Sequence, residues 1–587
     1  MTLCLIPIKP DEIPKPADAG RADAGLIRLR ETLGTDSELA GFYESLVNDE
    51  GGRALLDAVF GNSPYLGRCL IQEAGCIRDM LTGGPDASFA ALLSELGETL
   101  ARETSLNRVT AGLRRAKRRA SLIVGMADIA GLWPLERVTG ALTDLAELCL
   151  HIAARYVLGA AAAHGAITLG DESDPENGSG YIVLGMGKLG ARELNYSSDI
   201  DLIVLYDAER VHGAREDALG PIFVKATRQL LHLMDARTED GYVFRTDLRL
   251  RPDPGATPVA ISAEAAEAYY ESVGQNWERA AMIKARPVAG DIGAGEAFLR
   301  RLRPYIWRKN LDFAAIQDVH SIKRQINAHR GGAKIAVNGH NIKLGRGGIR
   351  EIEFFCQTQQ LIWGGRIPEL RHRATVETLR ILARTGRIDT TTADEMAAGY
   401  AFLRKLEHRL QMVNDEQTHD LPRDDAGIAR IATFMGFVDA ATFRDALLHH
   451  LGRVEHHYAR LFEESPELGA GGALVFTGGE NHPDTVNTLE QMGFTDGGSI
   501  SNIVRSWHHG RYRATRSERA RQILTELMPH LLKAFANAAN PDTAFARFDE
   551  FIAGLPAGVQ LFSLFNANPA LLDMVADIMG GAPRIAD

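Results

Sequence analysis

A short β-rich region interrupts a chain whose apolar residues otherwise recur at helical spacing. Residues 181–184 and 201–206 are rich in Ile, Val and Leu, and Gly and Ser residues separate them. A third such run lies within residues 242–250, and the amphipathic segment 222–234 precedes it. The order strand, turn, strand, helix, strand predicts a small sheet inside a predominantly helical α+β protein.

The length of 587 residues predicts two to four domains. We expect an N-terminal tail and helical region over residues 1–130 and a sheet-containing domain over residues 131–290. A helical bundle is expected over residues 291–468 and a helical connector over residues 469–587. Residues 469–496 have the Gly, Pro and Asn content that is typical of a linker.

The charge and hydropathy patterns exclude two classes of protein. There are 65 Lys and Arg residues against 76 Asp and Glu, and the net charge of −11 is the wrong sign for binding nucleic acid across the whole surface. We find no run of about 18 apolar residues that would span a membrane, and the N-terminus lacks a signal-peptide pattern. The sequence therefore predicts a cytoplasmic protein that binds neither nucleic acid nor a membrane.

Residues 185–190 match the GxGxxG pattern of dinucleotide-binding proteins, and Asp207 ends the next strand. Such a fold needs a helix of several turns after the glycines, whereas residues 191–198 are few and end in two serines. An NAD-binding oxidoreductase is therefore the weaker interpretation. The P-loop pattern GxxxxGK[ST] does not match at all.

Asp199 and Asp201 begin the second predicted strand with a spacing of two, which places both carboxylates on one face. That spacing suits a divalent cation, although a solvated strand end would also carry two acids. Asp247 lies in the third run, where Arg245, Asp247, Arg249 and Arg251 alternate on one predicted face. Burying such a face is unfavourable unless it meets phosphate and metal.

Paired acids, a third acid on a neighbouring strand and a Gly-rich turn are together typical of nucleotidyltransferases. In two-metal phosphoryl transfer, carboxylates hold the ions that brace the attacking and leaving oxygens. Backbone N–H groups of a Gly-rich turn can bind the phosphates of the nucleotide. The pattern therefore indicates metal-dependent phosphoryl transfer.

The segment GMGKLGARELNYSSDIDLIVLYD, residues 185–207, resembles the signature of the glutamine synthetase adenylyltransferases. The resemblance continues through residues 244–253, 275–286, 341–354 and 406–422. It implies a nucleotidyltransferase-type mixed sheet embedded among helices, followed by helical bundle domains.

Members of this family carry two catalytic units, of which the first removes AMP from a tyrosine of glutamine synthetase by phosphorolysis and the second attaches AMP from ATP. Asn195 and the segment 341–354 resemble the first unit, and no second paired-Asp strand follows Pro422. We therefore expect the adenylyl-removing half with a connector, from a truncated chain or a split gene product. The alternative is a catalytically inactive nucleotidyltransferase-fold protein with a regulatory or scaffold role.

The resemblance also implies roles for individual residues. The catalytic, metal-binding residues would be Asp199, Asp201 and Asp247, with Mg²⁺ or Mn²⁺ as the cofactor. Gly187 and Lys188 would meet phosphate, and Ser197 and Ser198 would shape the turn before the acids. Arg249, Arg251 and Lys284 would neutralise a phosphate group or form structural ion pairs. Residues expected to face the active cleft are Arg350, Glu351 and Glu353.

The expected protein partners are glutamine synthetase, as the substrate, and the signalling protein PII. The expected small molecules are inorganic phosphate, ADP or ATP, and glutamine. Phosphate would attack the tyrosyl-AMP phosphorus and give ADP and free tyrosine. A phenolate leaving group, with an ordinary pKa near 10, needs little help beyond the metal.

Overall fold

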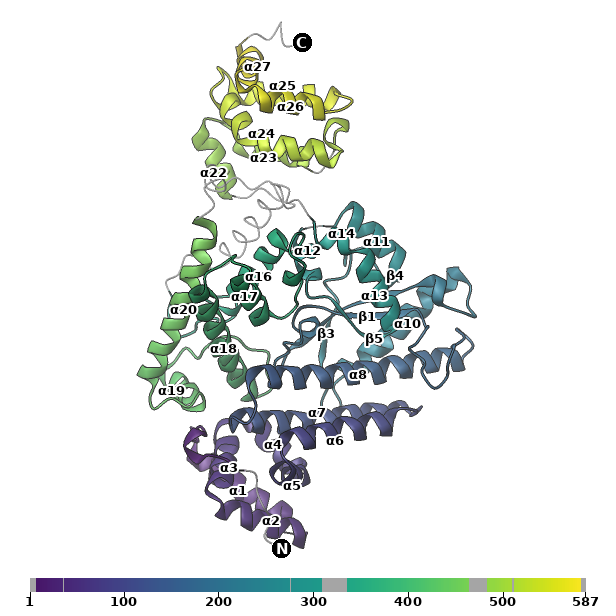
Figure 1. Ribbon diagram of the computed structural model, residues 1–587, viewed down its shortest axis with the longest axis vertical. Helices are drawn as coiled ribbons and strands as arrows, with labels where there is room; N and C mark the ends of the chain where they lie inside the picture. The colour runs from purple at the N-terminus through teal and green to yellow at the C-terminus, as the bar shows by residue number, and fades with distance from the viewer. Residues whose placement is uncertain are drawn as a thin grey trace. The chain divides into compact units, whose positions relative to one another are not determined.

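The computed structural model describes residues 7–34, 36–274, 276–308, 335–463, 483–508 and 511–581. The described residues up to Tyr458 form one compact unit, and those from Ala459 onward form a second. The first unit contains the sheet (Figure 1), so the prediction of a predominantly helical α+β protein is confirmed.

Helices precede the sheet along the chain. Capping side chains mark several of their starts: Asp49 accepts from the backbone N–H of Gly52, and Ser63 accepts from that of Leu66. Their bounds are α1 Ala19–Leu33, α2 Ser37–Asn48, α3 Glu50–Asn62, α4 Pro64–Gln72, α5 Ala74–Gly83, α6 Pro85–Leu100, α7 Leu106–Ile129 and α8 Leu135–Ala163.

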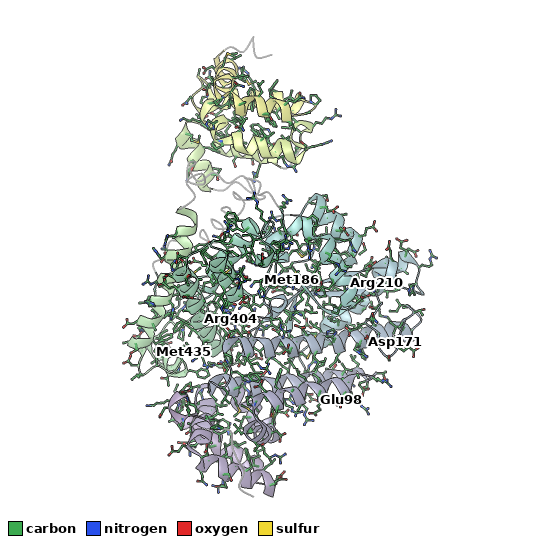
Figure 2. All side chains as sticks on the ribbon, viewed as in Figure 1. Glu98, Asp171, Met186, Arg210, Arg404 and Met435 are labelled. Atoms are coloured by element: carbon green, nitrogen blue, oxygen red, sulfur yellow. The ribbon has the colours of Figure 1, made fainter. Side chains whose placement is uncertain are left out.

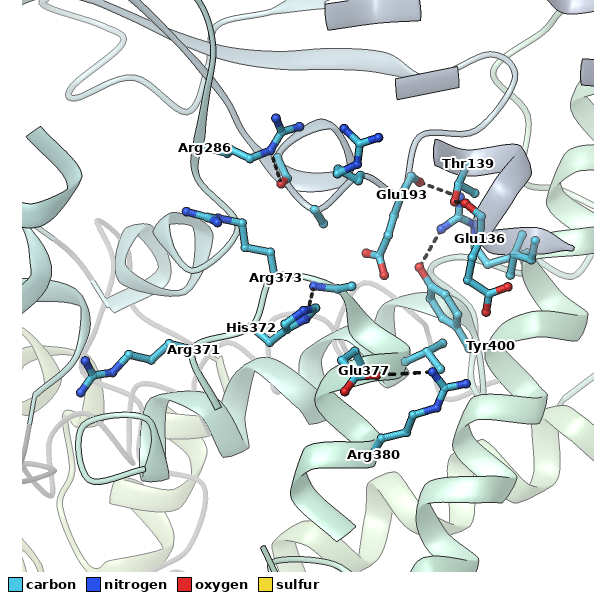
Figure 3. Close-up of a pocket in the computed structure, with 17 residues that line it drawn as sticks. Glu136, Thr139, Glu193, Arg286, Arg371, His372, Arg373, Glu377, Arg380 and Tyr400 are labelled. Atoms are coloured by element: carbon cyan, nitrogen blue, oxygen red, sulfur yellow. Dashed lines mark hydrogen bonds and ion pairs between the residues drawn. The ribbon is translucent and has the colours of Figure 1, made fainter. Parts of the chain in front are cut away.

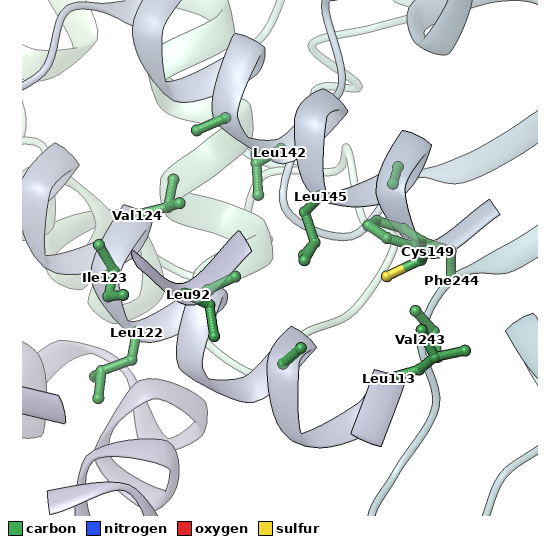
Figure 4. Packing of buried hydrophobic residues seen from close by; sticks show 14 of the residues in the cluster. Leu92, Leu113, Leu122, Ile123, Val124, Leu142, Leu145, Cys149, Val243 and Phe244 are labelled. Carbon is green, nitrogen blue, oxygen red and sulfur yellow. The ribbon is translucent and has the colours of Figure 1, made fainter. Parts of the chain in front are cut away.

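The core that carries the sheet is formed where α6, α7 and α8 pack together. Leu92, Leu113 and Leu145 of these helices belong to one buried cluster, in which Leu113 lies beside Val243 of the segment that leads into the third strand (Figure 4). All four side chains are buried. Burying this apolar area contributes about 25 cal/mol per Å² and holds the segment before β3 against the helices.

Helix α8 is long and apolar enough to cross a membrane, with a mean hydropathy of 1.4 over its most apolar window. Half of that window is buried inside the protein. Within the larger unit α8 packs against α7, α10 and β5. Its composition is therefore accounted for by its place in the core.

The sheet has the order β3-β2-β1-β5, with β4 paired to the far end of β2. β1 runs antiparallel to β2 and β5, whereas β3 and β4 run parallel to β2. The bounds are β1 Tyr181–Gly185, β2 Asp199–Tyr206, β3 Arg245–Asp247, β4 Ala260–Ser262 and β5 Arg286–Gly290. The helix α10, Glu216–Asp235, connects β2 to β3 and covers the predicted segment 222–234.

The sheet decides two interpretations of the sequence. The dinucleotide-binding fold is excluded, because β1 and β2 are antiparallel and the one helix between them, α9 (Gly187–Gly190), has only four residues. The prediction that the third strand runs to Leu250 is wrong. β3 ends at Asp247, whose carboxylate accepts the backbone N–H of Arg249 and turns the chain.

Further helices follow the sheet along the chain. Among them α18 is unusual because it buries Arg404, Glu407, His408 and Arg409. The bounds are α11 Ala263–Ser272, α12 Asn276–Met282, α13 Ile292–Arg301, α14 Arg303–Ile306, α16 Ile349–Trp363, α17 Thr375–Arg384, α18 Thr390–Met412, α19 Asp425–Phe434 and α20 Ala440–Glu463.

The second unit is helical and has its own apolar core around Trp507, Phe545 and Phe548. Its helices are α22 Pro483–Met492, α23 Gly497–His508, α24 Glu518–Ala536, α25 Pro541–Gly554, α26 Val559–Ala567 and α27 Pro569–Gly581. The prediction of a linker over residues 469–496 is wrong for the part that begins at Pro483, because α22 begins there. Residues 469–482 lie outside the described part of the chain.

Candidate functional site

The three predicted acids come together where β3 pairs with the start of β2. In this parallel pair Asp201 lies opposite Asp247 and Asp199 lies opposite Arg245. Side chains at paired positions of adjacent strands share a face, so the carboxylates of Asp201 and Asp247 are neighbours. The structure thus brings all three acids to the short β2–β3 ladder.

The glycine-rich turn lies directly against these acids. Gly187 has φ +48°, and a Cβ added to it would lie 3.1 Å from Oδ2 of Asp201. The backbone N–H of Met186 donates to the carbonyl of Asp201 over 2.9 Å. Glycine is therefore required both for the left-handed backbone and for the close approach to the carboxylate.

Asp201 occupies an environment that disfavours its charge. Burial and the carboxylates of Asp247 and Asp199 raise its pKa to about 6, against the opposing effect of Lys343 and Arg350. A divalent cation would relieve this repulsion between hard oxygen donors, and Mg²⁺ and Mn²⁺ prefer such donors. The chemistry of the donor set therefore fits a divalent metal.

Two of the acids are engaged by arginines. Arg245 Nε donates to Oδ1 of Asp199 over 2.7 Å, and Arg249 Nε donates to Oδ2 of Asp247 over 2.8 Å. Within the described ranges, no three carboxylate, imidazole or thiol groups are already grouped as metal ligands. The side chain of Arg249 is 84% exposed, so its ion pair is weak and Asp247 can exchange it for a cation.

The serines before the acids support the β2 entrance. The Oγ and carbonyl of Ser197 accept from Arg245, and its N–H donates to Oε1 of Gln411 over 3.0 Å. Ser198 Oγ donates to Oδ1 of Asn195. These contacts hold the backbone ahead of Asp199 in place.

Lys188 is committed to a buried carboxylate. Its Nζ lies 2.9 Å from Oε1 and 3.0 Å from Oε2 of Glu407, which is fully buried on α18. Burial and the nearby Arg404 and Lys343 lower the pKa of Lys188 to about 8, although Glu407 acts in the opposite sense. Lys188 thus ties the glycine-rich turn to α18.

Lys284 likewise lies in a buried network. Its Nζ is 2.9 Å from Oε2 of Glu193 and 3.9 Å from Oε1 of Glu353. Arg251 is used in the turn after β3, where it donates to the carbonyls of Leu248 and Pro254. Both residues have structural partners in the described part of the chain.

The residues around the start of α16 differ in their surroundings. Glu351 is buried and accepts the N–H of Gly347 over 2.9 Å, which fixes the loop before its own helix. Arg350 is exposed and lies near Asp201, whose charge it favours. Of the predicted cleft residues Arg350, Glu351 and Glu353, Arg350 is therefore the one whose charge favours the ionised form of Asp201.

Lys343 is the main site residue that sequence reasoning missed. It lies in the loop before α16 and favours the ionised form of Asp201. Its only signal was its place in the matched segment 341–354, because it lies 142 residues after Asp201 along the chain. Glu407, the partner of Lys188, was equally hidden in the segment 406–422.

The charge of Glu353 gives a testable pH dependence. Although burial opposes ionisation, Lys284, Lys188, Arg350 and Lys343 lower the pKa of Glu353 to about 2. The group therefore stabilises the fold above its unfolded pKa of about 4.3, and this stabilisation is lost as pH falls toward 2.

We expect Glu353→Gln to lower the melting temperature most at pH 6–7, and the deficit to shrink between about pH 5 and pH 3. Melting curves of both proteins across this range measure it. A deficit that stays constant with pH would contradict this account of the charge.

Comparison with known proteins places the site in context. Residues 54–301 match the family model described as glutamate-ammonia ligase adenylyltransferase. Residues 320–462 match the model described as GlnD PII-uridylyltransferase. The site carboxylates lie in the first matched region, and Lys343, Arg350 and Glu407 lie in the second.

Several curated relatives are similar over nearly the whole chain. Each is described as a bifunctional glutamine synthetase adenylyltransferase/adenylyl-removing enzyme. The relative from Mesorhizobium japonicum is 52% identical over 97% of this chain and 58% of its own length. The one from Rhizobium meliloti is 49% identical over 98% of this chain and 58% of its own length. The chain thus spans less than two thirds of these relatives.

Proposed function

This chain belongs to the glutamine synthetase adenylyltransferase family, and from that we propose that it removes AMP from adenylylated glutamine synthetase by phosphorolysis. The observation that carries the proposal is the β2–β3 ladder, where Asp201 lies opposite Asp247 and against the Gly187 turn. The reaction would help to regulate nitrogen assimilation.

We propose Mg²⁺ or Mn²⁺ as the cofactor, held by Asp201 and Asp247 with Asp199 beside them. When bound, such an ion neutralises the phosphoryl oxygens and the developing phenolate. Release of Asp247 by the exposed Arg249 is then part of assembling the site.

The chain's own residues would supply binding and orientation. Lys343 and Arg350 provide positive charge near Asp201 and would attract phosphate. The Gly187 turn lets a phosphate group approach the backbone closely, because no Cβ occupies that space. Arg249 and Arg251 remain weaker proposals for the same role.

In the proposed reaction an oxygen of inorganic phosphate attacks the phosphorus of the tyrosyl-AMP ester. A bond forms between that oxygen and phosphorus, and the bond between phosphorus and the tyrosyl oxygen breaks. The phenolate takes a proton, so the products are ADP and unmodified glutamine synthetase.

We propose PII as a further partner, which the similarity to a PII-uridylyltransferase supports. Inorganic phosphate and ADP are proposed as substrate and product. ATP and glutamine are proposed as further ligands, and the cytoplasm as the location. No binding to nucleic acid or to a membrane is proposed.

The direction of catalysis tests the proposal. One paired-Asp strand supplies one active site in the described residues, and the resemblance assigns that site to removal. We expect the protein to form ADP from phosphate and adenylylated glutamine synthetase, but not to attach AMP from radiolabelled ATP. Robust attachment without removal would assign the site to the opposite reaction.

The same assay separates catalysis from a scaffold role. A scaffold protein without catalysis would bind glutamine synthetase but show no turnover that depends on Mg²⁺. We also expect ADP to bind in a metal-dependent manner.

A further inference from the structure

A cavity of about 620 Å³ lies beside the turn that follows α9 (Figure 3). Its walls come from the first turns of α8, from residues 190–193, from residues 371–380 and from α18. The described residues that line it do not include Asp199, Asp201 or Asp247. Its volume is in the range of small-molecule binding sites.

The lining of this cavity is rich in arginine. Figure 3 shows Arg286, Arg371 and Arg373 along one side, with Glu193 and Tyr400 across from them. The full set of arginines is Arg192, Arg286, Arg371, Arg373, Arg380 and Arg404. A concentration of guanidinium groups around a hollow is unfavourable unless carboxylates or a bound anion compensate for it.

Four of these arginines are compensated within the protein. Each lies within ion-pair distance of a carboxylate that offsets its charge, although the pair of Arg380, whose side chain is 65% exposed, is weak. The pairs are Arg192 and Arg286 with Glu147, Arg380 with Glu377, and Arg404 with Glu407.

Arg371 and Arg373 differ from the other four. Arg371 Nε donates to the carbonyl of Gly364 over 2.7 Å, and Arg373 Nε donates to that of Ala285 over 2.9 Å. Among the described residues, neither forms an ion pair with a carboxylate within 4.0 Å; the guanidinium of Arg371 instead lies over the Trp307 ring, 5.8 Å from its centroid. Both residues line the cavity, and their charges are therefore not neutralised by an ion pair.

Electrostatics of the cavity wall agree with this geometry. Burial lowers the pKa of Arg371, and the nearby Arg303 lowers it further. Burial also lowers the pKa of Arg373, where Glu296 partly offsets the effect and Arg286 adds to it. Each guanidinium therefore lies near another positive charge, and a bound anion would reduce this repulsion.

We propose that this cavity binds a compact multivalent oxyanion on Arg371 and Arg373, at a site separate from the β2–β3 carboxylates. Planar guanidinium groups bind phosphate and carboxylate oxygens through paired N–H donors. The volume exceeds that of a bare oxyanion and leaves room for an organic part of the ligand. A phosphate ester and a polycarboxylate share this chemistry.

Position in the fold connects this site to the glycine-rich turn. Arg404 lines the cavity, and its Nε lies 2.9 Å from Oε2 of Glu407. Glu407 in turn pairs with Lys188 of the glycine-rich turn. The binding proposal does not depend on the proposed function, because it rests only on the cavity and its arginines.

Binding is tested with the full chain in EDTA, so that any metal-dependent phosphate binding at the carboxylates is silent. Melting temperature is followed against the concentration of inorganic phosphate in one arm and citrate in the other. The variants are Arg373→Gln and Arg371→Gln. Arg108→Gln is the matched control, since its side chain is 78% exposed and Arg108 does not line the cavity.

We expect saturable stabilisation by at least one probe and about tenfold weaker apparent affinity in each cavity variant. Arg108→Gln and Asp201→Asn should bind as the unchanged protein does. Response to phosphate alone would assign a phosphoryl ligand, and response to citrate alone would assign a polycarboxylate. The proposal is overturned if neither probe stabilises the protein, if both cavity variants bind normally, or if Asp201→Asn abolishes the effect. If Arg373→Gln does not fold, the binding measurement on Arg371→Gln decides the test alone.

Discussion

Asp201→Asn should reduce ADP formation by about 1,000-fold or more and leave the fold intact. Asp201 is central to the site, because it faces Asp247 across the ladder and lies 3.1 Å from the position of a Cβ on Gly187. Removing its charge removes a metal-binding oxygen donor. Turnover is measured as ADP released from adenylylated glutamine synthetase at saturating phosphate and Mg²⁺.

Stability provides the internal check on this variant. The like charges of Asp247 and Asp199 oppose ionisation of Asp201, so we expect the melting temperature of the variant to be unchanged or raised. Asp207→Asn is the matched control, because it makes the same substitution at the other end of β2. We expect normal turnover from it. Near-normal turnover in Asp201→Asn would remove the basis for the proposed site.

Glu407→Gln should lower the melting temperature of the larger unit by about 5–10 °C. The fully buried Glu407 carboxylate pairs with Lys188 and Arg404, and His419 Nδ1 lies 3.1 Å from its Oε1. Neutralising it leaves two buried cations without their partner, which costs about 3–5 kcal/mol. Thermal unfolding followed by circular dichroism measures the change.

The control for this variant is Glu95→Gln. Glu95 pairs with Arg119 on the surface over 2.8 Å, and its side chain is 59% exposed. Exposed pairs of this kind contribute about 0–1 kcal/mol, so its melting temperature should hardly move. Equal effects of the two substitutions would show that the buried network on α18 does not stabilise the fold.

Some of the architecture could be predicted because its cause is local in the sequence. β1 and the part of β2 after Asp201 are continuous apolar runs, and the spacing of Asp199 and Asp201 places both at the entrance of one strand. The short segment between the strands excluded a crossover helix, and β1 and β2 are indeed antiparallel. The identification of the family from its motifs was also confirmed.

Other features could not be predicted because they depend on contacts distant in the sequence. β4 has only three residues, and β5 contains Pro287 and Gly290 and so lacks the apolar run of β1; pairing with β2 and β1 makes them strands. Lys188 meets a carboxylate 219 residues away, and Lys284 meets one 91 residues away. The four-part division of the chain and the roles of individual site residues remain proposals.

The fate of labelled phosphate tests the central claim most directly. Adenylylated glutamine synthetase is incubated with this protein, Mg²⁺ and ³²P-orthophosphate, and the nucleotide products are separated. We expect labelled ADP that carries the isotope in its β-phosphate, in amounts equal to the AMP lost from glutamine synthetase, and no product without metal. Release of unlabelled AMP, or no release of nucleotide at all, would contradict phosphorolysis at the Asp201 site.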